Sequence, residues 1–207
     1  MKELITRYPA LSNCSDAIEK AKNILIAAFG SGNKLLICGN GGSCADSDHI
    51  VGELMKGFLL RRSVSEKFRL EAEKMFPGNA KYICENLQGA LPAIALTAHS
   101  GLISAFANDV AADMIYAQQV LGYGKPGDVF LGISTSGNSA NVVNAAKVAK
   151  LQGLKIIALA GKKQCFLDEI ADVVIHAPET ETFKVQELHL PIYHYLCAEC
   201  ERKFFGE

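Results

Sequence analysis

A histidine and a glutamate stand four positions apart in GNGGSCADSDHIVGE, residues 39–53 of the chain. Residues i and i+4 of a helix lie on one face, so His49 and Glu53 would point to a common spot if this stretch is helical. Imidazole and carboxylate groups bind zinc, and both can transfer protons. The pair alone does not distinguish a metal or acid–base site from an ordinary helix surface.

The chain offers further groups of this kind in FKVQELHLPIYHYL, residues 183–196. At about 100° per residue, Gln186 and His194 lie roughly 80° apart around a helix, and His189 lies on the other side of Gln186. All three side chains therefore cannot face one point equally well, and the spacing leaves His189 and His194 as competitors. Pro191 lies inside the pattern and could kink the helix, which would change these angles.

A glycine-rich loop precedes the His–Glu pair. The loop GNGGS, residues 39–43, follows the apolar run KLLIC. Its glycines permit a close approach of a ligand to the backbone, and the N-terminus of the next helix supplies free N–H groups. The loop lacks the final glycine of the dinucleotide-binding pattern G-x-G-x-x-G, and the next strand comes too late for that motif. A nucleotide cofactor is therefore disfavoured.

A second loop, STSGNS at residues 134–139, is rich in hydroxyl groups. The hydroxyls of Ser134, Thr135, Ser136 and Ser139, together with backbone N–H groups, could surround one phosphate at a helix N-terminus. No lysine lies within the loop, so it is not a Walker A site. The loop predicts a site for a small phosphate monoester.

The elements that position these groups alternate along the chain. Short apolar runs predict buried strands, and longer stretches with helical spacing predict helices between them. The expected strands are 34–39, 93–98, 128–134, 155–161 and 172–177. The expected helices are 14–30, 43–57, 100–121, 138–152, a short one near 165–170, and 182–204. This order predicts an α/β fold with a parallel sheet covered on both faces, and with ligands at the carboxyl ends of its strands.

Residues 57–91 do not fit the alternation, because they carry two short helical patterns around a Pro-Gly break and no clear strand. We predict a helical excursion beside the helix that follows the glycine-rich loop. A solvated surface hairpin and a functional lid are equally compatible with the pattern.

Composition limits the class of protein. The 207 residues fit one domain, residues 1–207, and a net charge of −1 gives no basic footprint for a nucleic acid. No apolar run reaches the roughly 18 residues of a membrane span, and the N-terminus lacks an apolar signal core. Seven cysteines, an odd number, favour reduced thiols in the cytoplasm. The CxxC at 197–200 lies in a helical pattern without a second CxxC, so we interpret it as structural.

These motifs together resemble the phosphoheptose isomerases of the sugar isomerase (SIS) fold family. The resemblance rests on GNGGS followed by H-x-x-x-E, on GISTSGNSANV, on the pair Asn108-Asp109, and on Q-E-x-H-x-x-x-x-H. It runs from about Asn33 to the C-terminus and excludes a stretch at 58–88. It implies a three-layer, flavodoxin-like SIS fold with a five-stranded parallel sheet, N-terminal helices and a helical insertion around 58–88.

The resemblance also implies a metal-dependent isomerase that converts sedoheptulose 7-phosphate to D-glycero-D-manno-heptose 7-phosphate. One Zn²⁺ per subunit would be held by His49, Glu53, Gln186 and His194, which favours His194 over His189. Glu53 would be the catalytic base and His194 the catalytic acid. A homotetramer with sites between subunits is implied. The substrate-binding residues would be Asn40, Gly41, Gly42, Ser43, Glu53, Asn108, Asp109, Ser134, Thr135, Ser136, Ser139 and Gln186.

The implied chemistry is consistent with the residue types. Aldose–ketose exchange moves a proton between adjacent carbons, which a carboxylate can carry, while zinc can stabilise the enediolate and a histidine can protonate oxygen. Three features depart from the family. The stretch at 58–88 is longer than the link expected there. An arginine shortly after the glutamate is missing, with Lys56, Arg61 and Arg62 as candidate replacements, and an aspartate before Gln186 is missing. The alternatives are an isomerase of another ketose phosphate and a non-catalytic SIS adaptor that binds a phosphosugar as a regulator.

Overall fold

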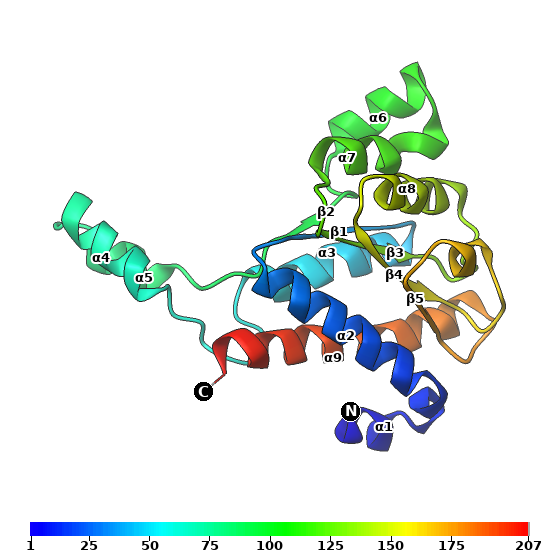
Figure 1. Cartoon of the computed structure of the whole chain (residues 1–207), viewed down its shortest axis with the longest axis horizontal. Helices are drawn as coiled ribbons and strands as arrows, with labels where there is room; N and C mark the ends of the chain where they lie inside the picture. The colour runs from blue at the N-terminus through cyan, green and yellow to red at the C-terminus, as the bar shows by residue number, and fades with distance from the viewer. Residues whose placement is uncertain (207) are drawn as a thin grey trace.

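The computed structural model describes residues 1–206, and five strands form one parallel sheet at its centre (Figure 1). The sheet order is β2-β1-β3-β4-β5. Every residue of β1 and β3 is buried, as expected for central strands with helices on both faces. The five predicted strands are confirmed, although β2 is three residues long rather than six. The strand bounds are β1 Leu35–Gly39, β2 Ala93–Ala95, β3 Val129–Ile133, β4 Lys155–Ala160 and β5 Val173–His176.

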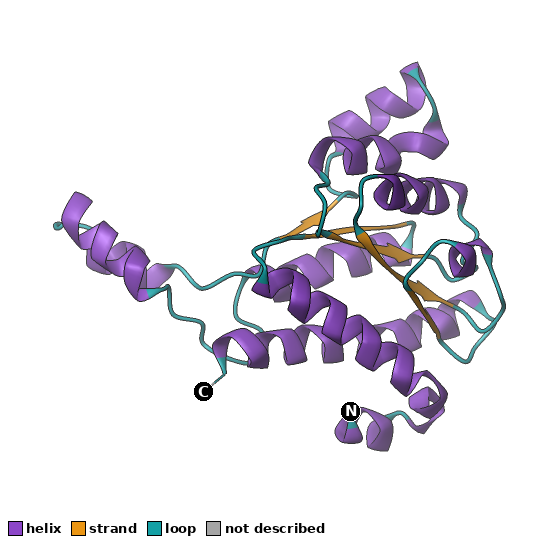
Figure 2. Ribbon diagram, viewed as in Figure 1, coloured by secondary structure: helices purple, strands orange, loops and turns teal. Residues whose placement is uncertain are grey.

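Helices cover both faces of the sheet and complete three layers (Figure 2). On one face, α2 (Ser15–Gly30), α3 (Gly42–Met55) and α9 (Thr182–Phe205) enclose a core that includes Leu35 and Ile37 of β1. On the other face, α7 (Ile115–Tyr123) and α8 (Ala140–Leu151) enclose a core that includes Leu36 and Cys38. Alternate residues of one strand thus serve opposite cores. The predicted three-layer α/β fold is confirmed.

The other helical elements flank these layers or lie beyond them. They are α1 Lys2–Arg7, η1 Pro9–Cys14, α4 Glu66–Met75, α5 Ala80–Asn86, α6 Ser100–Asp109, η2 Ala112–Met114 and η3 Phe166–Glu169. Within residues 1–206, none of the helices combines the length and the apolar character needed to cross a bilayer.

The direction of the sheet order changes at β1, which has β2 on one side and β3 on the other. Crevices for ligands form at such a switch point, outside the carboxyl ends of the strands. The glycine-rich loop leaves β1 and the hydroxyl-rich loop leaves β3, and these two strands are hydrogen-bonded neighbours. The fold therefore brings both predicted loops to one place.

The prediction of one continuous helix at 100–121 is wrong. The structure divides it into α6, η2 and α7. Ala111 is extended, with φ −160° and ψ 124°, so the helix cannot continue through it. α7 packs in the layer over the sheet, whereas α6 lies outside α7 (Figure 1). No proline or glycine marks the break, which explains why the sequence pattern reads as continuous. By contrast, α9 continues through Pro191 over 24 residues.

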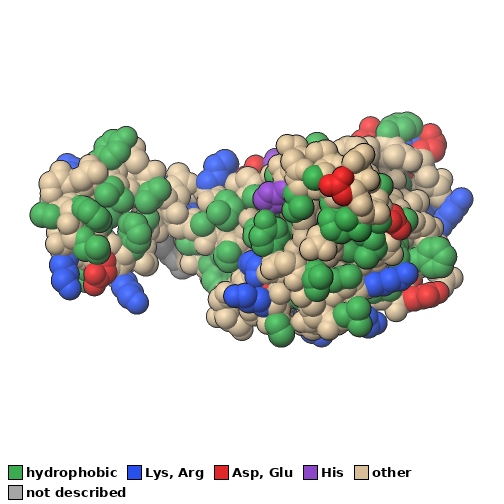
Figure 3. Space-filling view, turned by 90° about the horizontal axis from the view of Figure 1, so that it is seen from above, with side chains coloured by type: hydrophobic (Ala, Val, Ile, Leu, Met, Phe, Trp, Pro, Cys, Tyr) green, Lys and Arg blue, Asp and Glu red, His purple; other side chains and the backbone are tan. Residues whose placement is uncertain are grey.

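The insertion at 58–88 carries α4 and α5 and projects from the body as an arm (Figures 1 and 3). The predicted helical insertion is confirmed, but its predicted position beside α3 is wrong. Ala72 and Ala80 are the buried residues of α4 and α5. Seven large apolar side chains of the arm are between 44% and 67% exposed: Leu59, Phe68, Leu70, Met75, Phe76, Tyr82 and Leu87. Too few side chains are available within the arm to cover these groups.

Candidate functional site

Glycines allow α3 to start directly beneath the end of β1. A Cβ atom on Gly39 would lie 2.6 Å from the Ser43 carbonyl oxygen, so a larger residue would displace the first turn of α3. Gly41 has φ +56°, a conformation that L side chains rarely adopt. The chain therefore turns within two residues and presents the N-terminal N–H groups of α3 at the edge of the sheet.

Helices α3 and α9 lie side by side and run in the same direction; we call them the helix pair. At their N-termini, a Cβ atom on Gly42 would lie 2.6 Å from Gln186 Nε2, so this glycine makes room for the glutamine amide. Two turns further on, the ring centroids of His49 and His194 are 5.0 Å apart. The helix pair thus places Gln186 against the glycine-rich loop and the two histidines two turns further along. We call the line of contact between the two helices, which carries these side chains, the groove of the helix pair.

His49, Glu53 and His194 come together within the helix pair. His49 Nε2 lies 3.1 Å from Glu53 Oε1, while Glu53 Oε2 and His194 Nε2 are buried without a hydrogen-bond partner. Burial and the neighbouring His49 lower the pKa of His194, so the neutral imidazole is favoured. A buried polar atom without a hydrogen-bond partner is costly, and two such atoms near His49 form a natural place for a cation.

His189 occupies a different environment. It is fully buried, its Nε2 lies 3.2 Å from the Ala160 carbonyl oxygen, and burial lowers its pKa to about 4. It therefore faces β4 as a neutral side chain of the core. The spacing left His189 and His194 as competitors, and the structure places His194, rather than His189, beside His49.

We tested whether the four proposed metal ligands fit a metal ion. Within residues 1–206, no three side chains among His, Cys, Asp and Glu already converge as a preformed metal cluster. The donor types nevertheless match the nitrogen and oxygen ligands of zinc, and the unpartnered atoms of Glu53 and His194 lie in the same groove as His49. Gln186 stands against Gly42 at the mouth of this groove. The donor types of these residues fit a metal ion.

The hydroxyl-rich loop is compact and leads into the N-terminus of α8. Ser134 Oγ lies 3.0 Å from Ser139 Oγ and 3.4 Å from Ser136 Oγ. Gly137, with φ +66°, allows the tight turn between them. Three hydroxyls and the first N–H groups of a 12-residue helix thus surround one point, which suits a phosphate. Thr135 contributes its backbone carbonyl to this loop by accepting from the Gly161 N–H.

Asn40 connects the two loops. Its amide exchanges two hydrogen bonds of 2.9 Å with the amide of Asn141 in the first turn of α8. The Tyr116 hydroxyl donates to the Gly39 carbonyl oxygen at 2.9 Å and lies 3.3 Å from Asn40 Oδ1. These contacts fix the separation of the glycine-rich and hydroxyl-rich loops. Neither Asn141 nor Tyr116 was identified from the sequence.

Asn108 and Asp109 lie apart from this arrangement, at the end of α6. The Asn108 amide donates to the Asp109 carboxylate at 2.8 Å, and both side chains are exposed. Within residues 1–206, no hydrogen bond joins either of them to the two loops or to the helix pair. The structure therefore does not bring these two predicted substrate contacts to the rest of the site within one chain.

The prediction that Arg62 could replace the missing family arginine is wrong. Its side chain is fully buried, and its Nε donates to Glu201 Oε1 at 2.8 Å. Of the other candidates, Lys56 lies near the site, with its Nζ 3.8 Å from Glu53 Oε2, and Arg61 is exposed. Lys56 is thus the cation of this segment that the structure places beside the predicted base.

Arg62 instead joins α3 and α9 near their C-terminal ends. Its two Nη groups donate to the carbonyl oxygens of Leu54 and Glu53 at 2.6 and 2.8 Å. These carbonyl groups lie in the last turn of α3 and have no hydrogen-bond partner within the helix, so Arg62 supplies one. Glu201 of α9 accepts from the backbone N–H groups of residues 58–60. Burial would raise the pKa of Glu201, but these donors and Arg62 together hold it below its usual value. One ion pair therefore ties α3, α9 and the base of the arm together.

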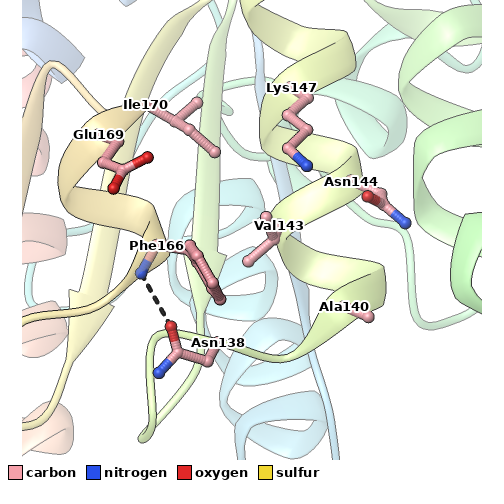
Figure 4. Close-up of a pocket in the computed structure, with 8 residues that line it drawn as sticks. All are labelled: Asn138, Ala140, Val143, Asn144, Lys147, Phe166, Glu169 and Ile170. Carbon is pink, nitrogen blue, oxygen red and sulfur yellow. Dashed lines mark hydrogen bonds between the residues drawn. The ribbon is translucent and has the colours of Figure 1, made fainter.

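Two hollows lie near the site. One, of about 520 Å³, lies between α1 and α9 and includes His194, Phe58 and Arg7 in its walls. The other, of about 370 Å³, lies between α8 and η3, where Phe166 faces Val143 and Asn138 accepts from the Phe166 N–H (Figure 4). This second hollow contains neither hydroxyls of the loop nor any residue of the helix pair. We therefore place the candidate active site next to the first hollow, whose walls include His194.

The cysteines take no part in the site. All seven are free, and Cys197 and Cys200 are buried on α9, where burial raises the pKa of both thiols. The CxxC pattern thus belongs to the packing of α9 in the core.

Comparison with known proteins agrees with this geometry. The fold and the hydroxyl-rich loop are those of a SIS domain, and the sequence model of the SIS domain family matches residues 9–90 and 69–161. A phosphoheptose isomerase from Synechocystis sp. is 37% identical over 191 residues, which cover 92% of this chain and 85% of the relative.

Solved structures give the same result. A phosphoheptose isomerase from Francisella tularensis superposes with a TM-score of 0.75 at 28% identity, covering 97% of this chain and 94% of that one. The phosphoheptose isomerase from Neisseria gonorrhoeae gives a TM-score of 0.71 at 29% identity, covering 95% and 93%. The chain therefore belongs to the phosphoheptose isomerase family of SIS domain proteins.

Proposed function

We propose that the protein converts sedoheptulose 7-phosphate to D-glycero-D-manno-heptose 7-phosphate in a metal-dependent reaction. Membership of the phosphoheptose isomerase family makes it a sugar-phosphate isomerase. The observation that carries the metal-dependent part is the groove of the helix pair, where Glu53 Oε2 and His194 Nε2 are buried without hydrogen-bond partners beside His49.

In this proposal the two loops bind the ends of the substrate. The hydroxyls of Ser134, Ser136 and Ser139 and the N-terminus of α8 receive the phosphate. The glycine-rich loop, held by Asn40, lies against the sugar chain, and the absence of side chains there permits a close approach. The carbonyl end of the sugar then reaches the groove between α3 and α9.

The residues of the groove divide the proton transfers. Glu53 removes the proton from the carbon next to the carbonyl and returns it to the neighbouring carbon, through an enediol. His194, kept neutral by burial, exchanges a proton with the substrate oxygen. A zinc ion held by His49, Glu53, Gln186 and His194 would stabilise negative charge on the substrate oxygens. Lys56 adds positive charge beside Glu53.

The family resemblance also implies a homotetramer, and α6 supports this part of the proposal. None of the ten residues of α6 is buried, although Leu102, Ile103 and Phe106 are among them. Asn108 and Asp109 at its end do not contact the site of their own chain. We propose that α6 packs against a neighbouring subunit and carries these two residues to that subunit's site.

The test is turnover of sedoheptulose 7-phosphate by the zinc-loaded protein, before and after removal of zinc by a chelator and after its return. We expect activity that is lost on chelation and restored by zinc. Turnover that survives complete removal of divalent ions would overturn the metal-dependent part of the proposal.

Two alternatives give different results in the same experiment. An isomerase of another ketose phosphate would bind zinc and be stabilised against heat by phosphosugars, without turning over sedoheptulose 7-phosphate. A non-catalytic SIS adaptor would be stabilised by a phosphosugar but would neither bind zinc nor show turnover of any ketose phosphate.

A further inference from the structure

Asp46, Tyr193 and His49 form a chain of side chains across the helix pair. The Tyr193 hydroxyl oxygen lies 3.0 Å from His49 Nδ1 and donates to Asp46 Oδ1 at 3.1 Å. Tyr193 is 1% exposed, and its ring stands edge-on to both His49 and His194, with centroids 5.5 and 5.0 Å apart. A buried hydroxyl between a carboxylate and an imidazole has little freedom to find other partners.

The hydrogen atoms of this chain can be assigned from donors and acceptors. An ionised aspartate only accepts, and a tyrosine hydroxyl has a single hydrogen to give. If Tyr193 gives its hydrogen to Asp46, its oxygen can only accept from His49, so Nδ1 of His49 must carry a hydrogen. The other ring nitrogen, Nε2, lies 3.1 Å from Glu53 Oε1. In a neutral ring with its hydrogen on Nδ1, Nε2 has a lone pair and no hydrogen to give to this carboxylate, so a cation would satisfy both atoms.

We propose that Asp46 and Tyr193 are positioning residues that hold His49 with a hydrogen on Nδ1 and with Nε2 directed to the metal and to Glu53. This inference rests on the proposed function and deepens it. A histidine that binds a metal through one nitrogen needs the other nitrogen hydrogen-bonded, because that bond fixes both the tautomer and the orientation of the ring. Here the partner is a tyrosine on the opposite helix, so the same contact also fixes α3 against α9.

The chain offers a matched control on the same helix. Tyr195 lies two residues beyond Tyr193, and its hydroxyl donates to Glu19 of α2, at 2.5 Å. Replacement of either tyrosine by phenylalanine removes one hydroxyl and retains the ring. Only Tyr193→Phe breaks the contact with His49.

The first experiment measures zinc affinity of the full-length protein by competition with a chromophoric chelator. We expect Tyr193→Phe and Asp46→Asn to weaken zinc binding by about 10- to 100-fold, the range found for such supporting residues. Tyr195→Phe should stay within about twofold of the original protein. Thermal unfolding of the zinc-free variants reports any loss of the fold itself. Zinc affinity unchanged by Tyr193→Phe would overturn the proposal.

The second experiment needs no zinc. Nitrogen-15 NMR spectra of the zinc-free protein distinguish a ring nitrogen that carries a hydrogen from one that does not. The His49 signals are those lost in His49→Gln. We expect a hydrogen on Nδ1 that exchanges slowly with water, and faster exchange in Tyr193→Phe. An Nδ1 without hydrogen, which would mean that Tyr193 donates to it, would overturn the proposal.

The two readouts separate this inference from the proposed function. If the protein binds no zinc but His49 carries the slowly exchanging hydrogen on Nδ1, the metal-dependent function fails and the positioning chain stands. If zinc binds and turnover is normal while Tyr193→Phe leaves both readouts unchanged, the function stands and the positioning chain fails.

Discussion

The helix pair and the arm are stabilised in opposite ways. α3 and α9 bury their contacts, including the ion pair of Arg62 with Glu201 and the hydroxyl of Tyr193. The arm instead leaves large apolar groups such as Met75 and Tyr82 exposed, and its two helices have 10 and 7 residues. We therefore expect the buried ion pair at the base of the arm to contribute more to stability than the exposed apolar residues of α4 and α5. We expect burial, more than residue type, to determine how much a side chain contributes to the free energy of unfolding.

The largest effect should come from the groove of the helix pair. Glu53→Gln removes the proposed base and keeps its size, so we expect kcat to fall by about 10²- to 10⁴-fold, the usual contribution of general acid–base catalysis. Steady-state turnover of sedoheptulose 7-phosphate measures this. Glu187→Gln, on the exposed side of α9, is the control and should retain full activity. Retention of more than a tenth of the activity by Glu53→Gln would exclude Glu53 as the base.

The next effect should come from the ion pair where the two regions meet. Arg62→Met leaves Glu201 buried without a charged partner, and breaking a buried pair in this way costs about 3–5 kcal/mol of the free energy of unfolding. Urea titration followed by circular dichroism measures the loss. Arg61→Met is exposed and should change the free energy by less than about 0.5 kcal/mol. Equal free energies of unfolding for the two variants would mean that the buried ion pair contributes no more to stability than an exposed arginine.

The smallest effect should come from the arm. Met75→Gln and Tyr82→Ser change side chains that are 64% and 67% exposed, so we expect each to shift the free energy of unfolding by about 0.5 kcal/mol or less. The same urea titration, at protein concentrations spanning a hundredfold range, measures this. A loss above about 2 kcal/mol that depends on concentration would mean that these groups are covered in an assembly.

The sequence predicts the sheet well because its signal is local. Runs such as KLLIC and DVFLGI are apolar throughout, and each lies between helices that bury both faces of the strand. The two loops follow from the same local signal, since parallel strands end at one edge of the sheet. The family resemblance then proposes the ligand set and selects His194, whereas helical spacing alone left His189 in competition.

What the sequence does not predict depends on distant contacts. Asp46 and Tyr193 meet across 147 positions, and Arg62 meets Glu201 across 139, so no short pattern reveals either pair. The spacing of Asp46 and His49, three apart on one helix, was the only local signal that could have pointed to the first pair. The base of the arm is likewise held by a distant contact, because the backbone N–H of Phe58 donates to Glu201 across 143 positions.

The parallel arrangement of α3 and α9 has a consequence for the time at which the site forms. α3 follows the first strand of the sheet, whereas α9 follows the last, so their side chains meet only after closure of a loop that contains four of the five strands. Contacts of such high sequence separation form slowly and late in folding. We expect a folding chain to complete its sheet first and to acquire metal affinity afterwards, so zinc would stabilise the finished protein without accelerating its folding.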